Sequence, residues 1–385
     1  MSKLRSAITP RILVLFVGFL FCVAVVLTSG FLGQTREDDS FVTTQRARVL
    51  SVDNGGMSSD PMVDGMIIGR QILEVEILTG NHVGRHVRYE NTASRFFNIV
   101  GQEGMELLVQ VRENSDGSIA FVATLGHSRA PFMYIFVGLF LLVLIAVGRL
   151  KGLYSALSLV FTITTVVFFM IPMILQGQSP VLAAIITSVL TAVFSILIVS
   201  DVKPKGFAAI LGTFAGVLLA GVVSVFAGRV AHISGMHLEH AEEVFFQARE
   251  LSINIPQLLF AGIIISSLGA VIDIAMSISS VVFEIKDVNP TIGIKELYKR
   301  GMNVGRDIMG TMSNTLILAF AGGSITVMVI IALYRLPYIH FINLNLLALE
   351  VVQGISASFG LVLTVPVTAV LAAVMASGLN KKKNI

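Results

Sequence analysis

One ionisable side chain, Asp273, lies inside an otherwise apolar segment and is the first candidate for chemistry. A carboxylate in the hydrocarbon core of a membrane costs at least about 2.5 kcal/mol, so such residues usually bind a proton, a cation or a substrate. Small and polar residues recur around Asp273 at the spacing of one helix face. They are Ser266, Gly269, Ser277 and Ser280. This pattern indicates a helix with a polar stripe centred on the carboxylate.

A second stripe of small and polar residues follows on the next apolar segment. Its members are Asp307, Gly310, Thr311, Asn314 and Ala321. By helix rise, Asp273 lies roughly 16 Å and Asn314 roughly 12 Å from the cytosolic ends of their segments. Two antiparallel helices could therefore face each other across one site, at which Ser277, Ser280, Asp307, Thr311 and Asn314 add oxygen atoms to Asp273. The alternative is that small residues only let the helices pack closely.

Two further groups of side chains lie near the predicted outer surface. Glu350 begins the last apolar segment and either lines an outer vestibule or lies at the membrane interface. His237, His240 and Glu243 belong to a segment that is typical of an amphipathic helix on the outer leaflet. Histidine and carboxylate at this spacing are also a candidate site for a divalent metal ion. The surface-helix interpretation is favoured, because charged faces are common on surface helices.

The composition indicates that membrane helices position these residues. Of the 385 residues, 55% are hydrophobic and 13% are charged, whereas soluble domains carry about a quarter charged residues. Segments of about 20 apolar residues, long enough to cross a bilayer, recur along the chain and predict about eight transmembrane helices. The predicted spans are 11–33, 131–149, 153–175, 179–200, 206–228, 256–284, 307–334 and 351–378.

The placement of charge predicts the orientation of these spans. Every lysine falls on one predicted side, which the positive-inside rule assigns to the cytosol together with both termini. All 7 histidines fall on the other side. The first span is longer than the core of a secretory signal and has no small-residue cleavage site, which favours an uncleaved anchor. The only cysteine, Cys22, excludes a disulfide framework and a cysteine-based metal site.

The region 34–130 is the only segment long enough for an independent soluble core. Short runs with partial period-two alternation are separated there by turn sequences such as DNGG, LTGN and NSDG. The pattern predicts a small β-rich domain, an OB-like barrel. Such barrels often bind oligomeric ligands, but a docking or gating platform is the favoured interpretation, because a fold alone does not define a function. The chain is thus expected to have an anchor over 1–33, an extracytoplasmic β domain over 34–130 and a helical membrane domain over 131–380.

Several function classes are not favoured by the sequence. No phosphate-binding G-x-x-x-x-G-K motif occurs in the sequence. An intramembrane serine protease would need a histidine within a span, and a metalloprotease would need an H-E-x-x-H motif. The sequence contains neither feature. Asp307 lies nearer the cytosol than Asp273, which argues against a pair of catalytic aspartates. We expect no enzyme activity, no cofactor and no nucleic-acid partner.

Four segments carry a resemblance to a known family, and one of them is RLKGLYSALSLV (149–160) at the start of the third predicted span. LGAVIDIAMSISSVVFEIK (268–286), GMNVGRDIMGTMSNTLILAFAGGS (301–324) and LEVVQGISASFGLVLTVPVTA (349–369) resemble the YibE/F family of bacterial membrane proteins. The resemblance covers about residues 130–380, and the outer domain is similar to the longer, YibE-like form. It implies a multi-pass protein of the bacterial cytoplasmic membrane that associates with a shorter YibE/F-like paralogue or with itself.

The polar stripe leaves two functions open. In a transporter, permease or subunit of one, Asp273 would bind a proton or a cation, and the stripe would be hydrated and open to at least one side. In a membrane scaffold or envelope sensor that uses the outer β domain, the stripe would be dry and packed. Transport is the favoured interpretation, and neither its substrate nor its direction follows from the sequence.

Overall fold

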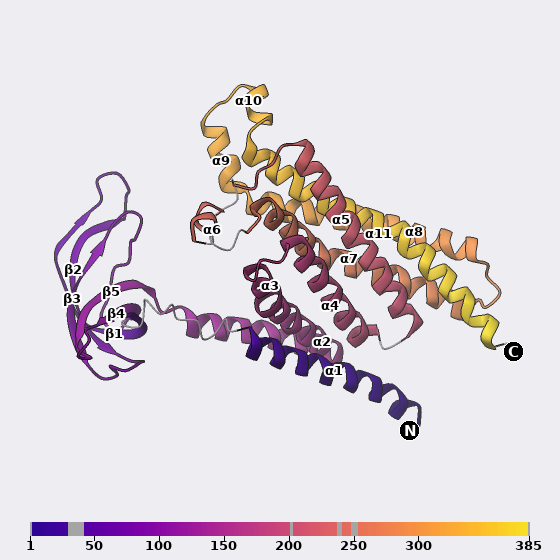
Figure 1. Ribbon diagram of the computed structural model, residues 1–385, viewed down its shortest axis with the longest axis horizontal. Coiled ribbons are helices and arrows are strands. Elements are labelled where there is room, and N and C mark those ends of the chain that lie inside the picture. The colour runs from indigo at the N-terminus through magenta and orange to yellow at the C-terminus, as the bar shows by residue number, and fades with distance from the viewer. Residues whose placement is uncertain (1, 30–41, 201–202, 237–240, 248–252, 384–385) are drawn as a thin grey trace. The chain divides into compact units, whose positions relative to one another are not determined.

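The chain folds as two compact units in the computed structural model, which describes residues 2–29, 42–200, 203–236, 241–247 and 253–383 (Figure 1). One unit covers residues 33–143 and contains the β-strands. The other combines residues 1–32 with 144–385 and is helical. Each unit has its own buried apolar core.

The β unit contains one five-stranded antiparallel sheet in the order β3-β2-β1-β4-β5. The strands are β1 (Val42–Ser59), β2 (Ile67–Ile77), β3 (His86–Ala93), β4 (Glu106–Glu113) and β5 (Ile119–His127). Alternate side chains point into the core, so that Ala47 and Val49 of β1 lie opposite Ile77 and Val75 of β2. This is the β-rich unit that the period-two alternation predicts.

The sheet curls into a half-barrel. The pairing of β1 with β2 is irregular at two places, one of them between Asp53 and Gly56, and such bulges bend a strand and increase its twist. The two edge strands approach each other, because the Tyr89 hydroxyl of β3 and Thr124 Oγ1 of β5 form a hydrogen bond of 2.8 Å. Within the described residues no backbone ladder joins these edges, so the sheet stays open there.

An ion pair fixes the turn that follows β1. The buried Asp60 carboxylate accepts hydrogen bonds from the Arg95 guanidinium and from the backbone N–H groups of Met62 and Val63. The hydrogen bond from Arg95 holds the pKa of Asp60 below its ordinary value of 3.8. Because the pKa of Asp60 is lower in the folded state than in the unfolded state, ionised Asp60 stabilises the β unit at pH values above the unfolded-state pKa. The contribution is lost as the pH falls through the folded pKa.

Replacing this carboxylate should therefore change how stability depends on pH. We expect Asp60→Asn to lower the melting temperature of the purified protein near neutral pH and to reduce the loss of stability below about pH 4. Thermal unfolding followed by circular dichroism at several pH values measures both effects. Asp64→Asn, which changes an exposed carboxylate in the same turn, is the control. An unchanged pH dependence in Asp60→Asn would contradict the assignment.

Long apolar helices form the second unit. The helices of the described chain are α1 (Ser2–Thr28), α2 (Ala130–Thr165), α3 (Ile171–Leu175), α4 (Pro180–Ser200), α5 (Pro204–Val230), α6 (Ala241–Gln247), α7 (Ile255–Val288), α8 (Ile294–Gly323), α9 (Ile325–Leu333), α10 (Tyr338–Ile342) and α11 (Asn345–Lys383). Among the described residues, five helices are long and apolar enough to cross a membrane, or six if the bent α8–α9 pair is one span. The apolar part of α1, Ile12–Thr28, is shorter.

Helix α2 doubles back on itself at Arg149. This residue has φ 50° and ψ −130°, which lies outside the helical region. A Cβ added to Gly152 would overlap the carbonyl oxygen of Leu144, although residues that far apart are separated by about 12 Å in a straight helix. The reversal falls between the predicted spans 131–149 and 153–175. The second arm continues through a π-helical turn, Val166–Met170, into α3.

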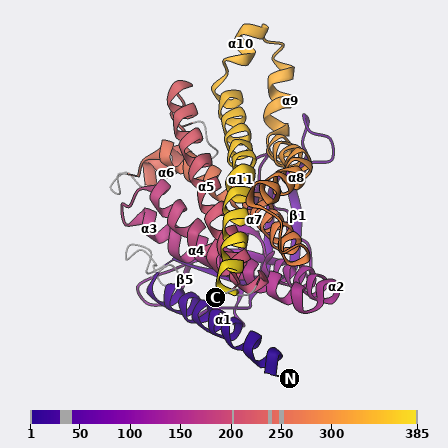
Figure 2. The ribbon, with the colours of Figure 1, turned by 90° about the vertical axis from the view of Figure 1, so that its right-hand side faces the viewer.

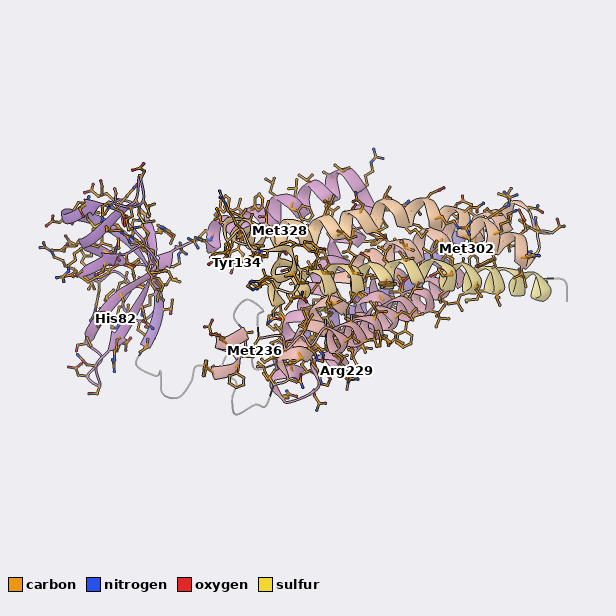
Figure 3. All side chains as sticks on the ribbon, turned by 90° about the horizontal axis from the view of Figure 1, so that it is seen from above. His82, Tyr134, Arg229, Met236, Met302 and Met328 are labelled. Atoms are coloured by element: carbon orange, nitrogen blue, oxygen red, sulfur yellow. The ribbon has the colours of Figure 1, made fainter. Side chains whose placement is uncertain are left out.

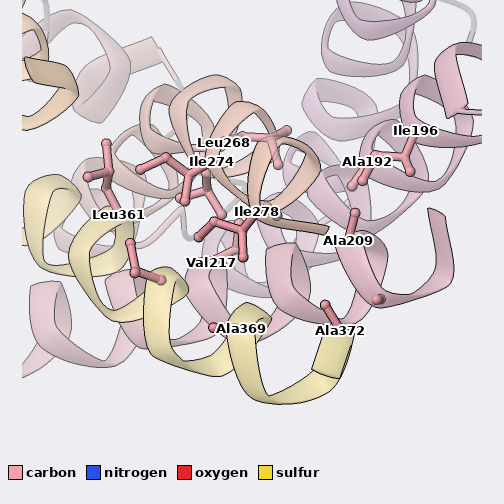
Figure 4. Packing of buried hydrophobic residues seen from close by; sticks show 14 of the residues in the cluster. Ala192, Ile196, Ala209, Val217, Leu268, Ile274, Ile278, Leu361, Ala369 and Ala372 are labelled. Atoms are coloured by element: carbon pink, nitrogen blue, oxygen red, sulfur yellow. The ribbon is translucent and has the colours of Figure 1, made fainter. Parts of the chain in front are cut away.

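The core of the helical unit lies between α4, α5, α7, α8 and α11. Figure 4 shows Ile274 and Ile278 of α7 among small and branched side chains of the neighbouring helices. In Figure 2, α11 stands between α5 and α8. Glycines allow this close packing, because a Cβ added to Gly212 or Gly216 of α5 would overlap a threonine hydroxyl of α11.

The predicted span 307–334 is bent. The axes of α8 and α9 differ by 60°, and Met302 and Met328 mark the two helices in Figure 3. The bend follows two successive glycines, and the Ser324 hydroxyl donates to the Phe320 carbonyl oxygen at 2.9 Å. Glycine favours such a break because it leaves the backbone flexible. Serine favours it because its hydroxyl can hydrogen-bond a carbonyl group of the preceding turn.

Candidate functional site

Asp273 lies midway along α7, on the exposed side of that helix. It faces a cleft of about 450 Å³ with walls from α2, α4 and α7. Helix α7 begins with Asn254, whose side chain accepts a hydrogen bond from the Gln257 backbone N–H, and with Pro256 in the first turn. It continues as regular helix past Asp273 to Val288. The carboxylate is therefore held by a continuous helix at one wall of the cleft.

Hydroxyl groups from two other helices line the same cleft. They belong to Ser155, Ser158 and Thr162 of α2 and to Thr191 and Ser195 of α4. The Ser158 hydroxyl donates to Ser195 Oγ at 2.5 Å and so links α2 to α4. The Thr191 side chain is buried, and its hydroxyl has no hydrogen-bond partner within the described part of the chain.

The remaining walls of the cleft are apolar, with Ile196, Leu268, Ile272 and Met276 among them. The cleft thus combines one carboxylate with several neutral oxygen atoms. Hard cations bind carboxylate and hydroxyl oxygens, and a carboxylate can also take up and release a proton. No group of three His, Cys, Asp or Glu side chains that could hold a metal ion occurs in the residues the structure describes. The arrangement suits a proton or a small cation.

Only part of the predicted stripe on α7 belongs to the cleft. Gly269 lines it together with Asp273. Ser277 and Ser280 are half-buried on the same helix face, further toward the end of α7, and do not line the cleft. Ser266 is exposed, and its hydroxyl donates to a carbonyl oxygen of its own helix. The polar stripe therefore extends beyond the site on both sides.

The stripe on α8 does not face Asp273 across the cleft. Helix α8 packs against α7 through its glycine side, where a Cβ on Gly305 would lie 3.1 Å from Ile278 Cδ1. Its polar stripe is on the opposite, exposed side and contributes nothing to the cleft lining. The members of the stripe on this side are Asp307, Gly310, Thr311 and Asn314, whereas Ala321 is half-buried and lines the cavity at the bend between α8 and α9. Glycine decides the contact because it lets the two helix backbones approach most closely.

The depth of the second stripe is nevertheless close to that of Asp273. Gly305 is level with Ile278, and counting by helix rise from this contact places Thr311 within about 2 Å of the depth of Asp273. Asp307 lies about 5 Å from the depth of Asp273, toward the N-terminal end of α8, by the same count. Asn314, which the sequence places at the level of Asp273, lies about 6 Å past it by the same count, on the side away from Asp307. The structure therefore differs from the prediction in the depth of Asn314 and in the orientation of the stripe.

Glu350 lies in a separate cavity at the bend between α8 and α9. This cavity measures about 170 Å³ and has mostly apolar walls, including Phe320, Met328 and Leu347. Glu350 is half-buried there, and Ser324 is the other polar lining residue. Glu350 is therefore not part of the cleft that contains Asp273.

The predicted metal-ligating residues are mostly outside the described part of the chain. His237 and His240 lie outside the described residues, and Glu243 is exposed on the short helix α6. Both the metal site and the surface-helix interpretation of this segment stay predictions.

The hydroxyls of α2 and α4 are the site residues that the sequence reasoning missed. Their spacing carried a signal, since Ser155, Ser158 and Thr162 share one helix face, as do Thr191 and Ser195. Such stripes are common in packed membrane helices, so the spacing alone does not point to a site. Only the reversal of α2 at Arg149 places one stripe beside the other.

Several long apolar helices, beside a separate β unit, indicate a membrane protein. The family model described as YibE/F-like protein matches residues 136–378, which is more than half of the chain, and the chain belongs to this family. The resemblance found in the sequence is thereby confirmed. The match covers the second arm of α2, α4 and α7 and so includes every residue of the cleft. No curated protein and no solved structure gives a significant match.

Proposed function

We propose that this protein is a membrane transporter or permease, or a subunit of one, and that Asp273 binds a proton or a small cation during transport. The observation that carries the proposal is the cleft itself. It joins one carboxylate to the hydroxyls of two other helices within a bundle of apolar helices. Polar groups are costly at membrane depth unless they line a pathway or a binding site.

A second candidate is a membrane scaffold or envelope sensor. The β unit supports it, because Phe96 is 95% exposed and Phe97 is 72% exposed in the turn after β3. Two neighbouring aromatic rings in solvent are typical of a binding surface. The strand order of the half-barrel is compatible with the OB-like barrel expected from the sequence, a fold that often presents a binding face.

An uptake assay tests the proposal directly. Purified protein is reconstituted into liposomes that contain dyes for pH, Na⁺, K⁺ or Mg²⁺, and gradients of each ion are imposed in turn. We expect at least one gradient to collapse faster than in protein-free liposomes, because a transporter that uses Asp273 couples to a proton or a cation. Rates equal to those of protein-free liposomes for every ion would contradict coupled transport and favour the sensor.

The proposal includes an eight-span topology in the bacterial cytoplasmic membrane with both termini in the cytosol. It counts α1 and each arm of α2 as separate spans, together with α4, α5, α7, the α8–α9 pair and α11. The lysine distribution supports this orientation, and the reversal at Arg149 supports the division of α2. The β unit would then lie outside the cytosol.

Cysteine labelling distinguishes the two sides of the membrane. In a Cys22→Ala background, Ser58→Cys and Ser179→Cys should react with an impermeant thiol reagent in intact cells. Ser2→Cys and Asn289→Cys should react only after the cells are permeabilised. Labelling of Asn289→Cys from outside would contradict the proposed orientation.

A further inference from the structure

Helix α8 has its polar side turned away from its own bundle. The buried side packs against α7 and α11, where Gly301 and Gly305 contact Ile278 and Val365. The opposite side is exposed over about three turns and carries two charges, a hydroxyl and an amide. Its members are Arg306, Asp307, Gly310, Thr311 and Asn314, and we call them the α8 face. A helix that faced lipid would show the reverse pattern.

Lipid is a poor neighbour for the α8 face. Thr311 lies at the depth of Asp273, and no charged residue follows Asp307 until Arg335. Within the described part of the chain, neither Arg306 nor Asp307 forms an ion pair, and the Asn314 amide forms no hydrogen bond. Each unpartnered polar group is costly to transfer to an apolar medium, where no water is available to hydrogen-bond it. The α8 face therefore needs a polar partner.

We propose that a second copy of this chain covers the α8 face. Two copies enter the membrane in the same orientation, so a two-fold axis along the membrane normal places identical residues at the same depth. Arg306 and Asp307 are adjacent and opposite in charge, so each can pair with the other in the second copy. The Asn314 amide both donates and accepts hydrogen bonds and thus pairs with itself.

The backbone also permits this contact. A Cβ on Gly310 would meet no atom within 4 Å, so the centre of the α8 face is open to a second helix. Charge, hydrogen-bonding capacity and shape thus make the α8 face complementary to itself. A lipid-facing surface such as that of α5 is different, because Val222 and Phe226 are exposed there without polar neighbours of this kind.

Cross-linking in native membranes tests the proposal. Thr311→Cys and Asn314→Cys, each in a Cys22→Ala background and co-expressed as two differently tagged copies, are treated with a thiol oxidant. We expect covalent dimers that contain both tags, at several-fold higher yield than for Val222→Cys on α5. Equal yields at both surfaces, or no dimer, would overturn the proposal. A cross-link to a different protein, such as a shorter relative of the family, would also overturn it.

Charge reversal gives a second readout that depends on the pairing itself. Arg306→Asp puts like charges opposite each other and should reduce the cross-linking yield at Asn314→Cys. Adding Asp307→Arg exchanges the two charges and should restore it. Size-exclusion chromatography of each variant in mild detergent shows whether the fold is kept. A yield that is unaffected by Arg306→Asp in a folded protein would contradict the paired arrangement.

Discussion

Gly216→Val is expected to abolish folding of the helical unit. Gly216 lies midway along α5, where a Cβ would overlap Thr364 Oγ1 of α11 and would lie 2.9 Å from Val271 Cγ1 of α7. Thr364 cannot move aside freely, because it is buried and its hydroxyl donates to the Gly360 carbonyl oxygen at 2.7 Å. Overpacking a core ordinarily costs about 1–3 kcal/mol, and here valine pushes two helices apart at once.

The measurement is the yield of monodisperse protein in mild detergent. Gly262→Val is the matched control, since Gly262 is an exposed glycine of α7 with no atom within 4 Å of an added Cβ. Gly216→Ala should give an intermediate yield. Thr364→Gly should partly rescue Gly216→Ala, because it removes the side chain that the new methyl group overlaps. Parental yield from Gly216→Val would show that α5 and α11 are not in contact.

The sequence was sufficient to predict the long apolar helices of one unit and the β-rich character of the other. Apolar length identifies a membrane helix, and period-two alternation with turn signals identifies a strand, because both patterns follow from local geometry. The break between the predicted spans 131–149 and 153–175 coincides with the reversal at Arg149. The bend at Ser324 was not predicted, since hydropathy continues unchanged from α8 into α9.

The composition of the site was less predictable, because it depends on which helices meet. Asp273 was identified because a carboxylate within an apolar membrane segment is unfavourable in free energy and is therefore usually functional. The stripe on α8 was assigned to the same site because its depth and its residue types were suitable. Glycine at Gly301 and Gly305 instead turns the other side of α8 toward α7. A periodic pattern defines the face of a helix, and only packing shows what that face contacts.

Asp273→Asn is expected to remove ion coupling while the fold is kept. Asparagine has nearly the volume of aspartate and keeps its hydrogen-bonding reach, but it cannot ionise. The melting temperature and abundance should therefore equal or exceed those of the parent, since a costly charge is removed from a bundle of apolar helices. The rate at which the coupled ion gradient collapses in liposomes should fall to that of protein-free liposomes.

Variants at neighbouring residues distinguish the role of the Asp273 carboxylate from the roles of the hydroxyl groups around it. Ser158→Ala and Thr191→Val each remove one hydroxyl of the cleft and should lower the rate in part, because other oxygen atoms remain. Ser266→Ala is the matched control, because Ser266 is exposed on α7 outside the cleft and its hydroxyl bonds only its own helix. It should leave the rate unchanged. If Asp273→Asn transports at the parental rate and abundance, Asp273 is not the coupling group, and the scaffold or sensor becomes the better account.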